Sequence, residues 1–133
     1  MKKYLLFIFC LPALYLLAGC DPYTTTEIVI NNTSAHNVSV TLTSHKYDPH
    51  WGIEDIEVAA GGVASFTRSE MVYCGELDPN KKIEWISIKK SGEAAQKREF
   101  ENNNFFVTNR VEGGDCWYTV YLFNITDSLL QWE

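Results

Sequence analysis

Residues 38–43 read Val-Ser-Val-Thr-Leu-Thr, and this strict alternation of apolar and hydroxyl side chains decides the fold class. Successive side chains of a β-strand point to opposite faces, so one face of such a strand is apolar and the other is polar. A helix would instead place its apolar residues three and four positions apart. The stretch therefore predicts a half-buried strand in which Val38, Val40 and Leu42 face a core.

Similar runs lie on both sides of this stretch. Ile28 and Ile30 have the same spacing of two, and the turn-forming residues 31–36 that follow predict an antiparallel hairpin or a bent pair of strands. Further along, residues 56–58 precede Gly61-Gly62, which predicts a tight turn into another strand through Phe66.

Strand-like runs continue to the C-terminus. In residues 83–89 the alternation changes phase between Trp85 and Ile86, which predicts a β-bulge or burial of both faces. After a turn at Ser91-Gly92, shorter runs lead to the longest candidate strand, residues 116–124. We expect its inward-facing set to be Cys116, Tyr118, Val120 and Leu122.

Short strands thus follow one another at intervals of roughly ten residues, the pattern expected of a β-sandwich. We predict an all-β fold, an antiparallel β-sandwich of about seven to eight strands, after an N-terminal signal-peptide helix. The sandwich is expected to occupy residues 27–133 as one domain, a size that buries about two-thirds of the unfolded surface.

The first twenty residues have the composition of an export signal. Lys2 and Lys3 precede an uncharged apolar stretch over residues 4–17, and this order is typical of secretory signal peptides. A membrane-spanning helix is the alternative, but it needs about 20 apolar residues. This stretch is shorter and contains Pro12, so we expect residues 1–19 to be a cleaved signal peptide.

The apolar stretch ends in Leu17-Ala18-Gly19-Cys20. This motif resembles the lipobox of bacterial lipoproteins, in which one aliphatic and two small residues precede the cysteine that is acylated. The resemblance implies that Cys20 carries the lipid and that its acyl chains hold the mature protein on a membrane, since two chains already give stable anchoring. Residues 20–26 are then expected to be the lipidated cysteine and a tether.

The residue that follows the cysteine helps to decide whether a lipoprotein stays in the inner membrane or moves to the outer membrane. Asp21 in this position resembles the inner-membrane retention signal of enterobacterial lipoproteins, whereas lipoproteins of bacteroidete type follow a different rule. We expect a lipid-anchored location in the cell envelope, with the outer membrane favoured over the inner membrane.

The net charge of the chain limits the kinds of partner that it can bind. Without Lys2 and Lys3 the chain keeps 9 basic and 17 acidic residues, a net charge of −8. A surface this acidic repels phosphate backbones, so no nucleic-acid partner is expected. It is compatible with a basic partner, although surface charge commonly serves solubility alone.

Two cysteines remain once Cys10 leaves with the signal peptide and Cys20 is acylated. Cys74 and Cys116 are expected to form a structural disulfide, because exported proteins meet an oxidising compartment. Closing a loop of about 40 residues corresponds to roughly 4 kcal/mol of stabilisation. Free buried thiols are the alternative.

Three residues on one loop-like stretch are weak candidates for metal binding. Imidazole and carboxylate groups suit a divalent cation, and His45, Asp48 and His50 lie close together in sequence. Their spacing matches no ligand motif, so an incidental polar loop is the favoured interpretation. We expect neither a metal nor another cofactor.

Three aromatic residues near the C-terminus are candidates for binding a partner. Trp117, Tyr121 and Phe123 lie on one face of the longest strand, and an exposed aromatic strip can stack on sugar rings or anchor a protein. The alternative is that residues 125–132 fold back and cover them.

No pattern typical of catalysis occurs. The chain has no G-x-S-x-G motif, and no pair of carboxylates stands out among the 17 acidic residues. We therefore predict no catalytic residues and a protein that is not an enzyme.

Residues 27–67 also resemble small bacteroidete-type lipoproteins with an immunoglobulin-like or transthyretin-like β-sandwich. The resemblance rests on Asn31-Asn32-Thr33-Ser34, the alternating valines, and Ile56-x-Val58-x-x-Gly61-Gly62-x-x-x-Phe66. It favours a non-enzymatic envelope module that binds a protein or glycan. The alternative is an inhibitor or immunity-type lipoprotein that blocks a basic toxin or a lysozyme-like enzyme, for which we expect acidic side chains on one protruding loop.

Overall fold

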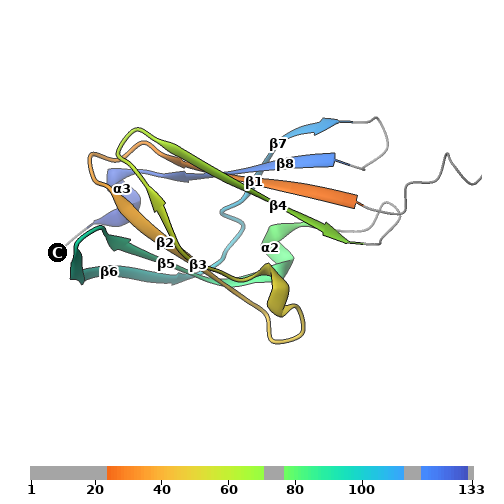
Figure 1. The fold of residues 1–133 in the computed structure, drawn as a ribbon, viewed down its shortest axis with the longest axis horizontal. Coiled ribbons are helices and arrows are strands. Elements are labelled where there is room, and N and C mark those ends of the chain that lie inside the picture. The colour runs from red at the N-terminus through yellow and green to blue at the C-terminus, as the bar shows by residue number, and fades with distance from the viewer. Residues whose placement is uncertain (1–23, 71–76, 113–117, 132–133) are drawn as a thin grey trace, which may run out of the picture.

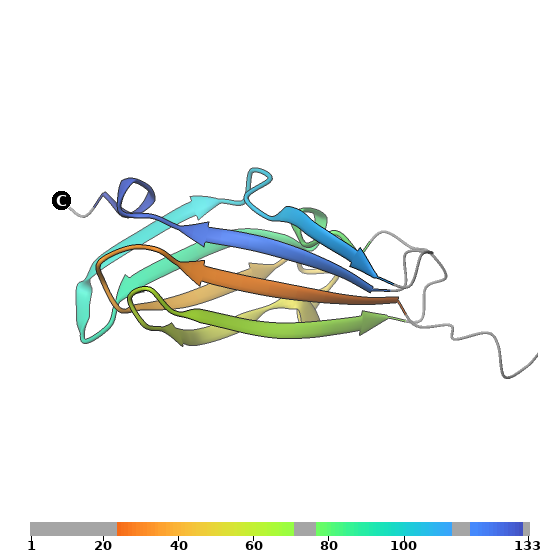
Figure 2. The same ribbon diagram turned by 90° about the horizontal axis from the view of Figure 1, so that it is seen from above.

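The chain forms two four-stranded β-sheets that pack face to face (Figures 1 and 2). The computed structural model describes residues 24–70, 77–112 and 118–131. Sheet A has the strand order β4 (Val63–Glu70), β1 (Thr24–Asn32), β8 (Tyr118–Ile125), β7 (Val107–Glu112). Sheet B has the order β3 (Ile53–Val58), β2 (Val38–Ser44), β5 (Ile83–Lys90), β6 (Glu93–Glu101). The short helices are η1 (Pro49–Trp51), α2 (Pro79–Lys82) and α3 (Asp127–Leu130).

The predicted all-β sandwich is confirmed. Neighbouring strands of the described sheets are antiparallel except for β1 and β8, which run parallel. The expected signal-peptide helix lies outside the described residues. Among those residues, no helix has the length and apolar character needed to cross a membrane.

The core lies between the inner faces of the two sheets. Ile28 and Ile30 from sheet A, and Val38 and Val40 from sheet B, are fully buried in it. Burying a side chain of this kind contributes about 1.5–3 kcal/mol, so the alternation in β1 and β2 directs much of the hydrophobic stabilisation to one side of each strand. The inward set predicted for residues 38–43 is confirmed.

Two connections lead from one sheet to the other. β1 lies in sheet A and β2 in sheet B, so of the two arrangements predicted for residues 28–42 the antiparallel hairpin is wrong. Gly61-Gly62 does form a turn, in which the N–H of Gly62 donates to the carbonyl of Ala59 (2.8 Å), but this turn also joins the two sheets. Alternation shows which side chains share a face and leaves the pairing of the strands undetermined.

The phase predicted for the last strand is also wrong. Phe123 and Ile125 are fully buried in the core and Tyr121 packs against it, so the odd-numbered residues face the other sheet. Val120 of the predicted set is also buried, but outside this core cluster. Both sets of side chains on this strand are largely apolar, and the sequence therefore left the phase ambiguous. Leu130 in α3 belongs to the same core, which confirms that the C-terminal segment folds back. Cys116 and Trp132 lie outside the described residues.

The sandwich begins earlier than predicted. β1 starts at Thr24 rather than at residue 27. Thr24 and Thr26 are buried, and the hydroxyl of Thr26 donates to the carbonyl of Leu77 (2.9 Å). Residues 24–26, expected in the tether, are therefore part of sheet A.

The phase change in residues 83–89 is a β-bulge. Thr43 pairs with Trp85 while Ser44 pairs with Ile83, so Glu84 is an extra residue in β5. Ile83 and Ile86 are buried, whereas Glu84 and Trp85 between them are both exposed. The bulge thus directs two consecutive side chains away from the core.

A buried asparagine, Asn32 at the end of β1, forms hydrogen bonds to the loops around it. The amide Nδ2 of Asn32 donates to the carbonyls of His36 (2.7 Å), Val58 (3.1 Å) and Ala59 (3.1 Å). Its Oδ1 accepts from the backbone N–H (3.1 Å) and the hydroxyl (2.6 Å) of Ser34. One side chain therefore connects the two crossovers at this end, β1–β2 and β3–β4.

Replacement of this asparagine is expected to destabilise the fold strongly. Asn32→Ala leaves several buried polar groups without partners, which should lower the free energy of unfolding by about 2–4 kcal/mol in urea denaturation. Asn31→Ala is the matched control, because Asn31 makes one exposed hydrogen bond, to Asn124 (3.0 Å). Equal losses in the two variants would contradict this account.

Cys74 and Cys116 lie outside the described residues, and their disulfide stays a prediction. The described strand ends that flank them are close together, because Glu70 pairs with Thr24 and Tyr118 pairs with Thr25. Each cysteine is at most four residues from one of these ends, a span of about 14 Å or less.

The disulfide can be tested by mass. Alkylation of the unreduced, denatured chain that starts at Asp21 should add no label, and alkylation after reduction should add two. Two labels without reduction would show free thiols.

Candidate functional site

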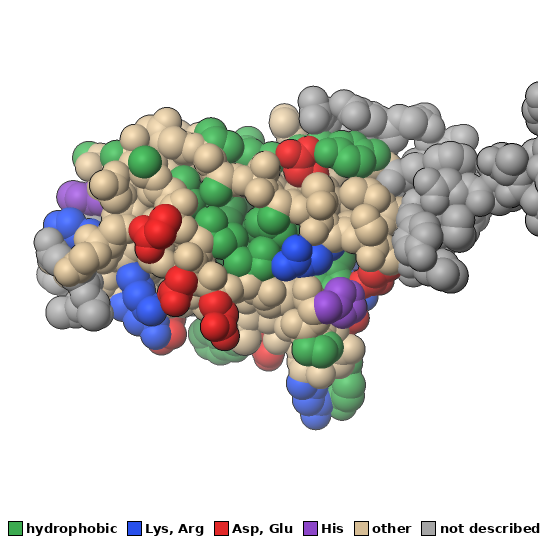
Figure 3. Space-filling view, in the orientation of Figure 1, with side chains coloured by type: hydrophobic (Ala, Val, Ile, Leu, Met, Phe, Trp, Pro, Cys, Tyr) green, Lys and Arg blue, Asp and Glu red, His purple; other side chains and the backbone are tan. Residues whose placement is uncertain are grey.

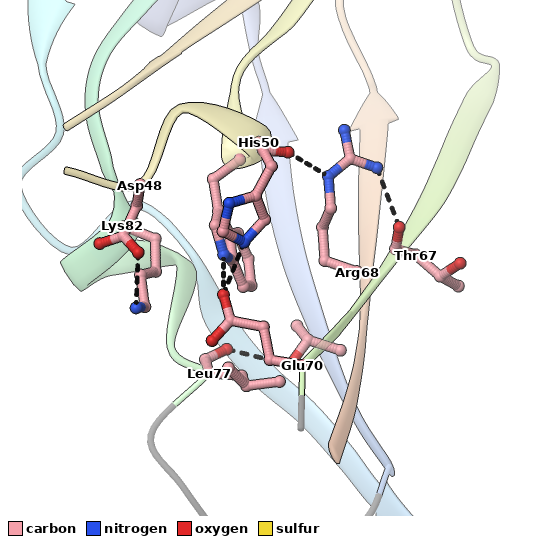
Figure 4. A network of polar contacts seen from close by, with 9 residues as sticks. Asp48, His50, Thr67, Arg68, Glu70, Leu77 and Lys82 are labelled. Carbon is pink, nitrogen blue, oxygen red and sulfur yellow. Dashed lines mark hydrogen bonds and ion pairs between the residues drawn. The ribbon is translucent and has the colours of Figure 1, made fainter. Parts of the chain in front are cut away.

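A cluster of charged side chains lies at the end of the sandwich where β1 begins (Figure 4). The loop after β2 leads into η1, where Trp51 is fully buried and fixes this turn to the core. Glu70 ends β4 opposite Thr24 of β1, and α2 brings Lys82 to the same place. The cluster therefore gathers side chains from three separate parts of the chain.

Direct contacts connect the cluster. The Oε1 atom of Glu70 accepts from Trp51 Nε1 (2.7 Å) and contacts His50 Nε2 (2.8 Å). Asp48 Oδ1 pairs with Lys82 Nζ (3.2 Å), and Arg68 Nε donates to the carbonyl of His50 (2.9 Å). Figure 4 shows the carboxylate of Glu70 directed toward the rings on η1, with Arg68 on the other side of this turn.

Glu70 is held in its charged form. Burial alone would raise the pKa of this carboxyl group, but the hydrogen bonds from Trp51 and His50 and the charge of Lys82 outweigh it and lower the pKa below 4.5. The charged form of Glu70 therefore stabilises the folded state.

Three side chains of the cluster are of types that can bind a metal ion. Asp48, His50 and Glu70 bring one ligand atom each to within 4.8 Å of one another, whereas His45 instead lies 3.9 Å from Glu84. However, Lys82 already occupies the position beside Asp48, and its ammonium group would repel a metal ion. The donor set fits a network of ion pairs and hydrogen bonds that holds η1 to β4 and α2.

Of this cluster, the sequence predicted Asp48 and His50 but not Glu70. Glu70 is 20 residues from His50 and reaches it only because β4 ends beside η1. No local pattern in the sequence marks this carboxylate.

Glu70 should make stability depend on pH. A lowered pKa adds stability that is present above about pH 4.5 and is lost as the pH falls through the folded-state value. Glu70→Gln should therefore lower the unfolding free energy by about 1 kcal/mol at pH 7, and the difference should shrink toward pH 3 in urea titrations. Glu101→Gln removes an exposed charge and serves as control; a loss for Glu70→Gln that is constant with pH would contradict the assignment.

The two described residues of the expected aromatic strip do not form an exposed surface. Phe123 is fully buried and Tyr121 packs against the core, while Trp117 lies outside the described residues. Two other aromatic side chains are exposed in the described part of the chain: Tyr47 at 82% and Trp85 at 47%. The sequence did mark the position of Trp85, through the phase change in β5, but did not show which face it takes.

Tyr47 lies on a loop that projects from sheet B. Figure 1 shows this loop, which leads into η1, extending beyond the sheet. Lys46 Nζ lies 4.7 Å from the centre of the Tyr47 ring, and Asp48 is bound to Lys82. The protruding loop therefore does not present the cluster of acidic side chains expected of an inhibitor.

Comparison with known proteins adds no assignment: no family model matches the chain, and no curated protein matches it significantly. The resemblances to the lipobox and to small bacteroidete-type lipoproteins stay predictions.

Proposed function

We propose that this protein is a lipid-anchored module of the bacterial cell envelope that binds a protein partner and is not an enzyme. The proposal rests on the distance between the lipobox and the sandwich. Thr24 is already buried in sheet A, only four residues after Cys20. Four extended residues span at most about 14 Å, so an acylated Cys20 would keep the sandwich against its membrane.

The described polar groups support binding rather than catalysis. Among the described residues, the cluster of Asp48, His50 and Glu70 is occupied by its own contacts, with Glu70 bound to Trp51 and Asp48 bound to Lys82. A catalytic base or nucleophile needs a free position beside the substrate. The contacts in this cluster instead fix a loop, which is how a binding scaffold presents its surface.

A protein partner is favoured over a glycan because two of the three residues proposed for sugar stacking are not free for it: Phe123 is fully buried and Tyr121 packs against the core. The exposed Trp85 lies beside Glu84 and pairs across the strands with Glu101, which favours a cationic partner. An inhibitor or immunity-type lipoprotein, which would block a basic toxin or a lysozyme-like enzyme, is the second candidate. The exposed acidic residues of β3 and of the surface around Trp85 favour it; those on β3 are Glu54, Asp55 and Glu57.

Acylation can be tested by feeding bacteria that express the full chain with a clickable palmitate analogue. The wild-type protein and Cys10→Ala should both be labelled, because Cys10 lies in the segment that is removed. Cys20→Ala should lose the label and its membrane fraction, since two acyl chains give stable anchoring. Labelling of Cys20→Ala equal to wild type would overturn the proposed anchor.

A further inference from the structure

The outer face of sheet B carries a half-exposed tryptophan surrounded by polar residues. Trp85 pairs across the sheet with Thr43 of β2 and with Glu101 of β6. Ser87 is the next outward residue of β5 and pairs with Glu99. We call this surface the Trp85 patch; its members are Thr43, Glu84, Trp85, Ser87, Glu99 and Glu101.

The Trp85 patch exists because β5 contains a bulge. In a regular strand, only one of Glu84 and Trp85 would face outward. The extra residue lets both do so, between the buried Ile83 and Ile86. A carboxylate and an indole ring are therefore placed side by side, with a second carboxylate, that of Glu101, directly across the strand pair.

The charge of the patch is negative and only partly balanced. Glu99 is paired with Lys97 (2.5 Å), and Glu84 lies 3.9 Å from His45. Glu101 is exposed, and its carboxylate has no hydrogen bond or ion pair with the rest of the described chain. An unpaired carboxylate beside an exposed indole is the arrangement that suits a cationic group.

A second observation independent of charge marks the same place. The side chain of Ser87 is 9% exposed, and its Oγ has no hydrogen-bond partner among the described residues. Buried hydroxyl groups are usually satisfied. The Ser87 hydroxyl is therefore a covered polar group on the same face of β5 as Trp85, and it has no hydrogen-bond partner among the described residues.

We propose that the Trp85 patch binds a cationic segment of a protein partner, with an arginine over the indole ring and its guanidinium paired with Glu84 or Glu101. Arginine suits both contacts, because its planar group stacks on aromatic rings and pairs with carboxylates through two hydrogen bonds. This proposal rests on the proposed function as a protein-binding module. The negative charge of the patch favours a cationic peptide over a neutral sugar.

The test measures binding of an acetylated, amidated tetra-arginine peptide by calorimetry in about 0.15 M salt, where exposed charges more than about 8 Å apart are largely screened. The protein is the chain from Asp21, which keeps every described element of the fold. Trp85→Ala and the double variant Glu84→Gln/Glu101→Gln should each weaken binding about fivefold or more, and Trp85→Phe should weaken it less. The indole N–H resonance of Trp85, assigned by its loss in Trp85→Phe, should shift on titration.

A matched charge variant separates the patch from general attraction to an acidic protein. Glu54→Gln/Glu57→Gln removes two exposed carboxylates from β3 of the same sheet and should weaken binding less than twofold, roughly what long-range charge alone contributes in salt. Equal weakening by the two double variants would overturn the proposal. So would unchanged binding by a folded Trp85→Ala, or binding of chitotetraose in place of the peptide at Trp85.

This experiment uses a chain without Cys20, so its result does not depend on acylation. Failure of peptide binding with normal labelling of Cys20 would refute the patch and leave the anchor. Peptide binding without labelling would refute the anchor and leave the patch.

Discussion

The whole structure depends on burying one face of each sheet against the other. Figure 2 shows the two sheets stacked along their length, and the described core contains no charged side chain. Each strand must therefore keep its apolar set on the inner side, because a shift of one residue would expose it. This constraint fixes the outward faces too, since side chains that alternate with the core residues along a strand lie on the opposite face of the sheet.

The bulge in β5 shows how this constraint produces a surface feature. Ile83 and Ile86 are three residues apart, yet both belong to the core. A regular strand cannot bury both, so the extra residue between them is accommodated by a bulge. The consequence on the outer face is the neighbouring pair of Glu84 and Trp85, on which the proposed binding surface depends.

The two ends of the sandwich are held by polar contacts rather than by the core alone. At one end Asn32 bonds the crossovers between the sheets. At the other end Glu70 joins β4 to η1 through Trp51 and His50, as Figure 4 shows. Figure 3 shows hydrophobic side chains between the two sheets on the side of β3 and β4. The hydrogen bonds of Asn32 and Glu70 at the two ends add to the packing of these side chains.

The sequence by itself determined the fold class, the inward residues of β1 and β2, and an interruption of the alternation in residues 83–89, because alternation and its interruption are local properties of a strand. It also supplied the motif at Cys20 that resembles a lipobox, which no described part of the structure tests. Only the tertiary structure decided that β1 pairs in parallel with β8, that Phe123 is buried, and that Glu70 meets His50. These depend on contacts between residues that are distant in the chain, and a pattern along one strand carries no information about its partner.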